Sequence, residues 1–320
     1  MKLTMLYSFL KSDIDLIEKE LERAISSTSP SLRDASLHLL QAGGKRIRPI
    51  FVLLAAKFGE YNIERVKNVA VALELIHMAS LVHDDVIDNA ELRRGKPTVK
   101  AEWDNRVAMY TGDYIFARAL EYMADIESIE AHQVLSNTMV ELCVGEINQI
   151  KDKYRFDQSL RDYLRRIKRK TAILIAASCQ IGAISANVPK CVSEQLFQFG
   201  YNVGMAFQIT DDILDFTATE AELGKPAGSD LWQGNVTLPA LYALEDEKMR
   251  EKIIGVNAHT TKSEIDEIIA HMKRSDVIER SHALSQRYLS RALSIVDELP
   301  SNRTKKTLRD IAKFIGKRKY

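Results

Sequence analysis

Residues 62–88 read NIERVKNVAVALELIHMASLVHDDVID and contain neither glycine nor proline. Apolar side chains recur there at steps of three and four residues, which is the period of one face of an α-helix. That face carries Leu73 and Ile76, and it ends on two carboxylates, Asp84 and Asp88. Residues four apart lie about 5–6 Å apart on a helical face. The stretch therefore predicts a long apolar helix with an acidic end.

A second helical stripe ends in the same way. The sequence GMAFQITDDILDF places Asp211 and Asp215 one turn apart, again with a third aspartate beside the first. Crowded carboxylates repel each other, so two such patterns favour bound cations. Mg²⁺ prefers oxygen ligands and completes its shell with water and phosphate oxygens. The two patterns therefore indicate a site for divalent cations and a diphosphate.

Helical periodicity continues along most of the chain, and no run of alternating residues favours a sheet. Short connections between the periodic segments are typical of antiparallel neighbours in a bundle. We therefore expect one all-α domain over residues 1–320, a bundle of about ten to thirteen helices. The expected helices are 3–26, 31–41, 46–58, 62–88, 103–124, 129–151, 158–186, 190–218, 236–246, 261–272, 275–295 and 303–315.

The composition argues against several classes of protein. The chain has 320 residues, is 46% hydrophobic and carries a formal net charge of +1, as an ordinary globular protein does. The small net charge argues against nucleic acid as a partner. No stretch reaches the ~20 apolar residues of a membrane span, so membrane contact would be at most peripheral. Three cysteines without metal-ligand spacing and the lack of a secretory segment predict a cytoplasmic protein.

Three basic loops bounded by glycine or proline accompany the acidic patterns. GGKRIRP contains Lys45 and Arg48 at an expected helix start, where both can face one anion. LRRGKP follows the first acidic pattern and contains Arg93 and Arg94. Guanidinium groups suit phosphate oxygens because their donors form a planar fork. GKP follows the second acidic pattern and contains Lys225.

Four further residues stand out inside expected helices. Lys170 and Thr171 open an apolar segment, after a basic run that otherwise indicates a solvated helix face. His77 lies two turns before Asp84. The sequence favours equally two interpretations of this residue: a contact with substrate and a place in the core. His83 lies about 100° around the helix from Asp84, so we interpret it as a support for the carboxylates and not as a ligand.

The order of these motifs resembles that of the trans-prenyltransferase (polyprenyl diphosphate synthase) family. The similarity covers nearly the whole chain, through GGKRIRP, ELIHMASLVHDDVIDNAELRRGKPT, GDY, KTA, GMAFQITDDILDF and GKPAGSD. It implies an isoprenoid synthase fold, with helices around a central active-site cavity. It also implies a Mg²⁺-dependent enzyme that adds isopentenyl diphosphate to an allylic diphosphate by repeated head-to-tail (1'-4) condensation.

The resemblance also implies a role for each matching residue. Roughly two to three Mg²⁺ ions would be held by Asp84, Asp88 and Asp211, and Asp85, Asp212 and Asp215 would complete the acidic shells. The isopentenyl diphosphate side would consist of Lys45, Arg48, His77 and Arg94. The allylic diphosphate side would consist of Arg93, Lys170, Thr171, Gln208 and Lys225. The catalytic residues would be Asp84, Asp88, Arg93, Lys170 and Asp211.

Product length is expected to depend on the residues just before the first acidic pattern. Ala79 and Ser80, about one turn before Asp84, are small and leave a shaft open, whereas Ile76 is a candidate for a partial obstruction. Short-chain members of the family tend to carry bulky aromatic residues there, so the resemblance implies a long-chain product.

Within the family the chain is most similar to the larger, catalytic component of bacillus-type two-component synthases that make heptaprenyl diphosphate, a menaquinone precursor. This similarity implies farnesyl diphosphate as the primer and a small, dissimilar second subunit as a partner. Homodimer contacts through the apolar N-terminal helices are a further expectation. The alternatives are a hexaprenyl or octaprenyl product, a class I terpene cyclase, or a non-catalytic regulatory subunit of the same fold. The paired basic loops argue against a cyclase, and the two intact acidic patterns argue against a regulatory subunit.

Overall fold

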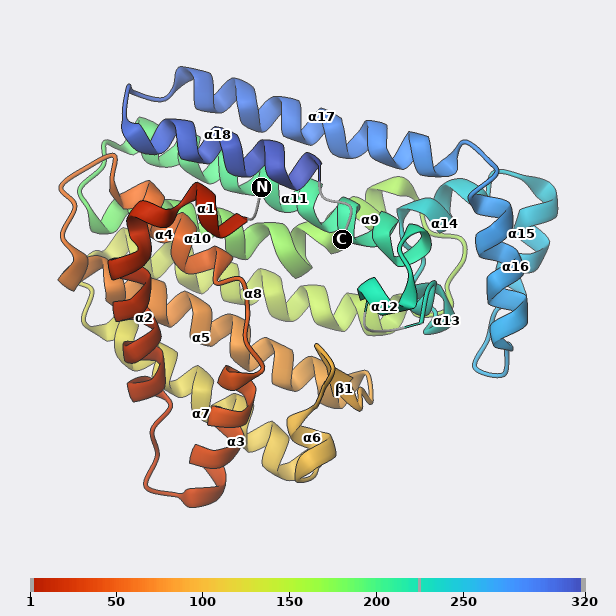
Figure 1. The fold of residues 1–320 in the computed structure, drawn as a ribbon, viewed down its shortest axis with the longest axis horizontal. Coiled ribbons are helices and arrows are strands. Elements are labelled where there is room, and N and C mark those ends of the chain that lie inside the picture. Colours follow the sequence, from red (N-terminus) through yellow and green to blue (C-terminus); the bar gives the residue numbers. More distant parts are fainter. Residues whose placement is uncertain (1–2, 224–225, 318–320) are drawn as a thin grey trace. The chain divides into compact units, whose positions relative to one another are not determined.

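The computed structural model describes residues 3–223 and 226–317, and it is almost entirely helical (Figure 1). Thirteen of the described helices have eight residues or more, so the predicted all-α fold class is confirmed. The chain divides into two compact units, Met1–Leu135 with Ala177–Leu196 and Ser136–Ala176 with Phe197–Tyr320. The expectation of one domain over residues 1–320 stays a prediction.

The elements of the first unit are α1 Leu3–Leu6, α2 Lys11–Ala24, α3 Pro30–Gln41, α4 Ile47–Ala56, α5 Ile63–Ile87, β1 Leu92–Arg93, β2 Lys96–Pro97, α6 Val99–Glu102 and α7 Asn105–Ala124. Those of the second unit are α9 Leu160–Ile167, α12 Glu220–Leu223, α13 Ser229–Trp232, α14 Leu238–Ala243, α15 Glu247–Ile254, α16 Lys262–Met272, α17 Val277–Glu298 and α18 Arg303–Gly316. Three helices contribute residues to both units: α8 Ile129–Asp152, α10 Ile173–Ser185 and α11 Lys190–Thr217.

Helix α5 forms the core of the first unit. Asn62 caps its start by accepting a hydrogen bond from the backbone N–H of Glu64, and Asp88 is the C-cap that follows its last residue, Ile87. Every side chain from Val69 to Ile76 is buried, so the helix is enclosed on all sides and not only along the predicted stripe. α7 packs along it (Figure 1). A helix enclosed in this way is a core helix, and the one charged residue in this stretch, Glu74, is buried with the apolar ones.

The predicted helix at 3–26 is interrupted. α1 ends at Leu6, a 3-10 turn spans Ser8–Leu10, and α2 begins at Lys11. The turn closes with a hydrogen bond from the Leu10 N–H to the Tyr7 carbonyl oxygen. Both side chains are buried, so this turn is part of the core and not a solvent-exposed connection.

The structure also contains a small sheet, whereas the sequence pattern predicts none. β1 and β2 pair antiparallel, with Arg93 opposite Lys96. Arg94 and Gly95 form the connecting turn, with φ angles of 54° and 76°. A two-residue hairpin turn of this kind needs positive φ at both central positions. Strands of two residues have no detectable alternation, which explains why the pattern does not reveal them.

The second unit contains a π-helical segment, Lys168–Ala172, between α9 and α10. The helix predicted for residues 158–186 is therefore present, but with a widened turn. Such turns occur mostly as single interruptions of an α-helix and often at functional sites. α15 is not among the predicted helices. None of the described helices is both long and apolar enough to cross a membrane.

Candidate active site

The first acidic pattern lies at the C-terminal end of α5. Asp84 and Asp88 are partly exposed and one turn apart, and the Asp88 N–H donates to the Asp84 carbonyl oxygen at 2.8 Å. Asp85 is only 3% exposed. Its carboxylate accepts from Arg93 Nε at 2.9 and 3.0 Å and from Arg93 Nη2 at 2.6 Å. The middle aspartate therefore holds the hairpin that follows the helix, and the outer two form the acidic end.

The hairpin carrying Arg93 and Arg94 is also attached to the end of α3. Lys96 Nζ donates to the Gln41 carbonyl oxygen at 2.9 Å. The His38 ring forms a hydrogen bond of 2.8 Å with the Pro97 carbonyl oxygen. These contacts fix the hairpin beside the loop that connects α3 to α4, which is the first basic loop of the sequence.

That loop has an unusual backbone. Gly43 and Arg46 both have positive φ, 79° and 47°, a conformation that is unfavourable for a residue with a side chain. Arg46 caps α4, and its guanidinium donates to Glu18 at 2.6 Å and to Glu74 at 3.3 Å. Although burial opposes it, contact with these two carboxylates raises the pKa of Arg46. Arg46 is therefore an internal ion-pair residue between two exposed or half-buried cations of the same loop, Lys45 and Arg48.

The two basic loops meet at Gly44. A Cβ atom at this position would lie 2.9 Å from Arg46 Nη1 and 3.1 Å from Arg94 Nη1. Glycine is thus the residue that allows the guanidinium groups of both loops to approach the same backbone. The pKa of Arg94 is lowered by desolvation and by the charges of Arg93 and Arg46, which also reflects the crowding of cations. We call Arg46, Arg48, Arg93 and Arg94 the arginine cluster.

Arg48 and His77 lie in the field of this cluster. Burial lowers the pKa of Arg48 to about 10, with Arg94 acting in the same direction and Glu74 opposing it. Burial and the charges of Arg48, Arg94, Arg93 and Arg46 hold the pKa of His77 well below its ordinary value of 6.5. The imidazole is therefore neutral near pH 7. Crowded guanidinium groups and a neutral histidine are suited to an anion, because an anion relieves the repulsion between the cations.

In the second unit the π-helical segment lies against the second acidic pattern. Gly204 of α11 has no room for a side chain, because a Cβ there would lie 2.6 Å from the Ala172 Cα. Thr171 Oγ1 donates to Gln208 Oε1 at 2.6 Å, and Gln208 Nε2 donates to Asp212 Oδ1 at 2.9 Å. Lys170 Nζ donates to Gln149 Oε1 at 2.9 Å. These contacts link the predicted residues Lys170, Thr171 and Gln208 to the helices around them.

Two of the three aspartates of the second pattern are buried. Asp212 accepts a hydrogen bond of 2.7 Å from the Tyr163 hydroxyl. Burial and the charge of Asp230 raise its pKa to about 7, although the hydrogen bonds from Tyr163 and Gln208 act against this rise. Asp215 accepts from the Ser229 hydroxyl at 3.0 Å and from the Asp230 N–H at 3.2 Å. Asp211 is the partly exposed member of the pattern.

Each unit offers carboxylate oxygens that suit a hard divalent cation: Asp84 and Asp88 in the first unit and Asp211 in the second. Mg²⁺ characteristically uses one or two protein carboxylates with water and phosphate oxygens. Over residues 3–223 and 226–317, no group of three or more His, Cys, Asp or Glu side chains is gathered as a metal site. An ion held mainly by water and substrate does not require such a group.

The remaining predicted residues differ in their surroundings. Ile76 and Ala79 are each 2% exposed, whereas Ser80 is half-buried and its hydroxyl donates to the His77 carbonyl oxygen at 2.8 Å. Lys225 lies outside the described residues. His83 packs against Gly112, where a Cβ would lie 2.3 Å from its Nε2, and it pairs with Asp113 at 3.2 Å. It therefore supports the contact between α5 and α7, whereas the sequence-based interpretation makes it a support for the carboxylates.

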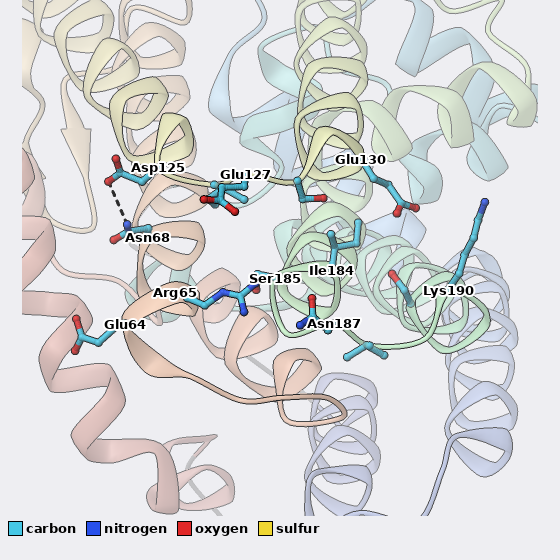
Figure 2. Close-up of a pocket in the computed structure, with 14 residues that line it drawn as sticks. Glu64, Arg65, Asn68, Asp125, Glu127, Glu130, Ile184, Ser185, Asn187 and Lys190 are labelled. Atoms are coloured by element: carbon cyan, nitrogen blue, oxygen red, sulfur yellow. Dashed lines mark hydrogen bonds between the residues drawn. The ribbon is translucent and has the colours of Figure 1, made fainter.

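Two cavities contain none of these predicted residues. One, of about 690 Å³, lies at the opposite end of α5, between its first turn, the connection before α8 and the connection after α10 (Figure 2). Its charges are mixed, with Glu64, Arg65, Asp125 and Lys190 among the lining residues. The other, of about 160 Å³, is lined by three arginines of the basic run together with Asn148, Asp152, Arg155 and Asp162.

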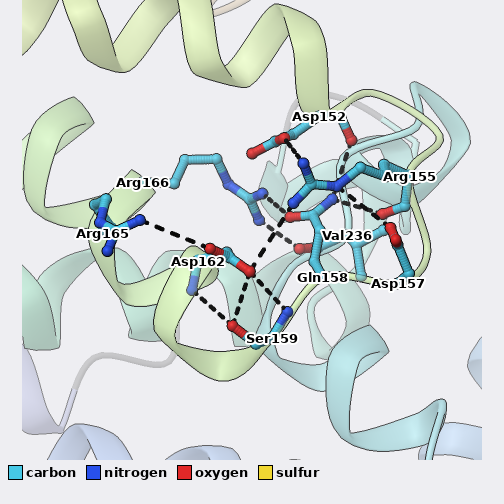
Figure 3. A network of polar contacts seen from close by, with 9 residues as sticks. All are labelled: Asp152, Arg155, Asp157, Gln158, Ser159, Asp162, Arg165, Arg166 and Val236. Atoms are coloured by element: carbon cyan, nitrogen blue, oxygen red, sulfur yellow. Dashed lines mark hydrogen bonds and ion pairs between the residues drawn. The ribbon is translucent and has the colours of Figure 1, made fainter.

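The polar network of Figure 3 corrects the interpretation of the basic run as a solvated helix face. Arg166 is only 8% exposed and donates to the Gln158 side chain and to the Val236 carbonyl oxygen. Arg155 forms ion pairs with Asp152 at 2.9 Å and with Asp157 at 3.3 Å. The run therefore contains one buried structural arginine, and nearby carboxylates neutralise the charge around it.

Three residues near the site have no counterpart in the sequence-based prediction. Glu74 is hidden in the apolar face of α5, and Glu18 is 28 residues away from the Arg46 that it contacts. Tyr163 is 49 residues away from Asp212. A charged residue inside the ELIHMASLVHDD motif is a signal that could have identified Glu74. No local pattern indicates the other two contacts.

Comparisons with known proteins agree with the motifs. Residues 29–272 match the model of the polyprenyl synthetase family. The chain is 64% identical over 320 residues to heptaprenyl diphosphate synthase component 2 of Geobacillus stearothermophilus, with 100% of both chains covered. A crystal structure of heptaprenyl diphosphate synthase from Staphylococcus aureus has a TM-score of 0.94 at 43% identity, covering 97% of this chain and 99% of that one.

A second solved structure adds a ligand. Polyprenyl synthase from Caulobacter crescentus CB15, crystallised with calcium and isoprenyl diphosphate, has a TM-score of 0.94 at 31% identity, covering 100% of this chain and 98% of that one. The family is generally dependent on divalent metal ions. Sequence, fold and motif order agree over the length of the chain. The chain therefore belongs to the polyprenyl synthetase family and is a prenyltransferase.

Proposed function

We propose that this chain elongates an allylic diphosphate, starting from farnesyl diphosphate, by repeated head-to-tail addition of isopentenyl diphosphate in the cytoplasm. The product would be heptaprenyl diphosphate, used for the side chain of menaquinone. The name of the relative at 64% identity, heptaprenyl diphosphate synthase component 2, supports this product. Hexaprenyl and octaprenyl diphosphate are the neighbouring alternatives.

The observation that carries the proposal is the meeting of the two basic loops in the first unit. Arg46 and Arg94 approach Gly44 from different loops, and Arg48 and His77 lie in the same positive field. A reaction that joins two diphosphate esters needs a site for the diphosphate that does not leave, in addition to the site for the one that does. A terpene cyclase has one diphosphate to bind, so a second anion site favours elongation.

Mg²⁺ is the cation that this donor set suits best. Asp84 and Asp88 of the first unit and Asp211 of the second would hold roughly two to three ions. When bound, the ions neutralise the charge that accumulates on the departing diphosphate. Asp85 supports the site indirectly, because it holds Arg93. Asp212 and Asp215 act in the same indirect way through their buried hydrogen bonds.

Two different groups of side chains would bind the two substrates. The isopentenyl diphosphate group would be bound by Lys45, Arg48, Arg94 and the neutral imidazole of His77. The allylic diphosphate would be bound by Arg93, Lys170, Thr171, Gln208 and Lys225. Fixed cationic donors around a leaving diphosphate favour cleavage of the allylic C–O bond because they stabilise the charge that develops.

Carbon–carbon bond formation would follow from this arrangement. The double bond of isopentenyl diphosphate attacks C1 of the allylic cation, and the released diphosphate takes the proton lost from C2 of the new unit. The hydroxyl of Thr171 and the amide of Gln208 are neutral dipoles, and their mutual hydrogen bond fixes their orientation. Neutral oxygens stabilise a carbocation without forming a bond to it as a carboxylate would. The product is again an allylic diphosphate, so the cycle repeats.

Product length would be set by Ile76, Ala79 and Ser80. Ala79 and Ile76 are both buried, each at 2% exposure. Ser80 is half-buried, and its hydroxyl is occupied by the carbonyl oxygen of His77. A serine whose hydroxyl is bonded to its own helix presents a nearly apolar surface, which suits a growing hydrocarbon chain.

The second subunit implied by the name "component 2" would bind an apolar face of α8. Val140, Val144 and Ile147 lie three and four residues apart on this helix and are 60%, 39% and 53% exposed. Exposed apolar stripes of this kind mark interaction surfaces. The apolar side chains of α2, such as Ile17 and Leu21, are instead buried. This difference favours α8 over the N-terminal helices as the surface for a small dissimilar subunit or for a second copy of the chain.

The deciding experiment supplies labelled isopentenyl diphosphate, farnesyl diphosphate and Mg²⁺ to the purified chain, with and without the small component from the same organism. Chromatography of the products measures their chain length. We expect heptaprenyl diphosphate when both components are present. Cyclic hydrocarbons, or no incorporation of label even with the small component, would refute the proposed function.

A further inference from the structure

Glu74 is the one charged side chain in the fully buried middle of α5, and it faces the arginine cluster. It is 3% exposed, and its Oε1 accepts from Arg46 Nη1 at 3.3 Å. Its negative charge helps to raise the pKa of Arg46, and it opposes the fall in pKa that burial causes at Arg48 and Arg94. A carboxylate so deep in a core is costly unless cations compensate it. Glu74 is therefore an internal partner of several arginines at once.

Arg46 connects Glu74 to the loop that contains Lys45 and Arg48. Its guanidinium lies between Glu74 and Glu18, with a further hydrogen bond of 3.4 Å to the Leu40 carbonyl oxygen. Its backbone is held at a φ of 47°. Two ion pairs on the side chain thus keep a strained backbone in place. Since Lys45 and Arg48 flank Arg46, this conformation determines where the two cations of the loop stand.

Two polar atoms in the same region lack a hydrogen-bond partner among the described residues. They are Oε2 of Glu74 and Nε of Arg48, and both are shielded from solvent. Buried polar atoms are nearly always satisfied in folded proteins. These two unpaired atoms indicate that the charges of the cluster are not fully neutralised, because several guanidinium groups share one carboxylate.

We propose that Glu74 is a positioning residue for the anion site: through Arg46 it fixes the 43–48 turn, and it keeps Arg46, Arg48 and Arg94 together before the diphosphate binds. Arg93 is held separately by Asp85. The inference rests on the proposed function, because it takes isopentenyl diphosphate as the anion. Glu74 acts through the arginines and not on the substrate, since a carboxylate in direct contact with a diphosphate would repel it.

The substitution Glu74→Gln tests this proposal. A positioning role and a purely electrostatic role of Glu74 predict opposite changes in the binding of isopentenyl diphosphate. If Glu74 were only a nearby negative charge, its removal would leave the cluster one unit more positive, and isopentenyl diphosphate would bind more tightly. If Glu74 positions the cluster, the KM for isopentenyl diphosphate rises by about tenfold or more. The KM for farnesyl diphosphate and kcat at saturation then stay close to those of the unchanged chain.

Glu64→Gln is the matched control. Glu64 lies in the first turn of the same helix, is exposed, and pairs with Lys67. The substitution makes the same change of charge far from the arginine cluster, so both KM values should be unchanged. Thermal unfolding of both variants checks that the fold is retained.

Arg46→Met, alone and combined with Glu74→Gln, distinguishes positioning from neutralisation. Replacing both members of a buried ion pair is often tolerated by the fold. We expect the double variant to keep the raised KM, because the turn has lost both anchors. If the double variant binds isopentenyl diphosphate as well as the unchanged chain does, Glu74 only neutralises Arg46 and the inference is wrong.

Titration calorimetry separates failure of this inference from failure of the proposed function. The unchanged chain, with its small component present, should bind isopentenyl diphosphate and convert it into product. If it does, and Glu74→Gln binds with equal or higher affinity, the inference fails while the function stands. If the unchanged chain neither binds isopentenyl diphosphate nor forms product, the proposed function itself is wrong. The inference about Glu74 is then wrong as well, because it takes isopentenyl diphosphate as the anion.

Discussion

Arg93 and Asp85 form a three-contact ion pair, with donor–acceptor distances of 2.6, 2.9 and 3.0 Å. The pair joins the last turn of α5 to the hairpin that follows it, so an acidic pattern and a basic loop that are neighbours in sequence also stabilise each other. Asp85 is thereby distinguished from Asp84 and Asp88, which are partly exposed. In the proposed function, the middle aspartate positions an arginine and the outer two hold metal.

Asp85→Asn should loosen the hairpin. Removing one partner leaves Arg93 uncompensated, but the Arg93 side chain is 27% exposed. We therefore expect a loss of roughly 2 kcal/mol in the free energy of unfolding, below the cost of breaking a fully buried pair. Denaturant unfolding measures this loss. The double variant Asp85→Asn, Arg93→Met should recover part of the stability but none of the activity. A double variant with restored activity would contradict the role of Arg93 at the allylic diphosphate.

Asp84→Asn and Asp88→Asn should act on chemistry and leave the fold intact. Both residues are partly exposed at a helix end, where substitutions usually change stability by about 0.5 kcal/mol or less. Weakening the charge stabilisation of a leaving group typically lowers kcat by about 10²–10³-fold. Steady-state kinetics over a range of Mg²⁺ concentrations measure both the loss and any shift in metal dependence. Activity within a few-fold of the unchanged chain would exclude these carboxylates as ligands.

Gly43→Ala and Gly44→Ala should have different consequences, although the residues are adjacent. Gly43 has a φ of 79° and open space around its Cα, so alanine there costs about 1–2 kcal/mol of stability through backbone strain alone. At Gly44 the new methyl group would lie 2.9 Å from Arg46 Nη1 and 3.1 Å from Arg94 Nη1. Both guanidinium groups must then move, which should raise the KM for isopentenyl diphosphate. Unfolding and steady-state kinetics together separate the two effects, and equal KM values for both variants would contradict the anion site.

His77 should make the protein less stable in acid. Its pKa is held well below 6.5 in the folded chain, while the unfolded chain has the ordinary value. Below pH 6.5 the unfolded state therefore takes up a proton that the folded state does not, and stability falls as the pH falls. Above pH 6.5 this contribution disappears. His77→Gln should weaken the dependence on pH in the acid range, as measured by denaturant unfolding between pH 5 and 8. An unchanged dependence would show that His77 is not buried among cations.

The residues before Asp84 should control product length. Ala79→Phe and Ser80→Phe introduce a large ring and are expected to give shorter products, whereas Ile76→Gly should give longer ones. Ala79 is only 2% exposed, so its variant should also lose about 1–3 kcal/mol of stability from overpacking. Ser80 is half-buried and should accept the ring at a lower cost. Product chromatography decides the outcome, and unchanged product length in the Ser80 variant would refute the assignment.

Helix α5 shows how much of a helix can be predicted from the periodicity of its apolar residues. The expected span, 62–88, differs from the observed Ile63–Ile87 by one residue at each end. An uninterrupted apolar pattern with asparagine at its start and aspartate at its end leaves few other possibilities. The same pattern conceals Glu74, because a single charged residue does not disturb the period. The hairpin at 92–97 is also hidden, since its two-residue strands contain no alternation.

Long-range contacts limit the prediction of the site. The motifs suggest which residues belong to each substrate, but they do not show that Arg46 is occupied by Glu18 and Glu74 while Lys45 remains exposed. Nor do they show that Asp212 is held by Tyr163. These partners are separated by 28 and 49 residues, and only the packing of helices brings them together.

The three shared helices, α8, α10 and α11, have a consequence for synthesis of the chain. The first unit is completed by residues 177–196, which follow a segment, 136–176, that belongs to the second unit. A ribosome therefore has to release part of the second unit before the first can close its core, although domains usually fold in the order in which they emerge. No single cut in the gene can therefore yield two complete units, and a fragment that ends after residue 135 would lack the 177–196 segment of the first unit.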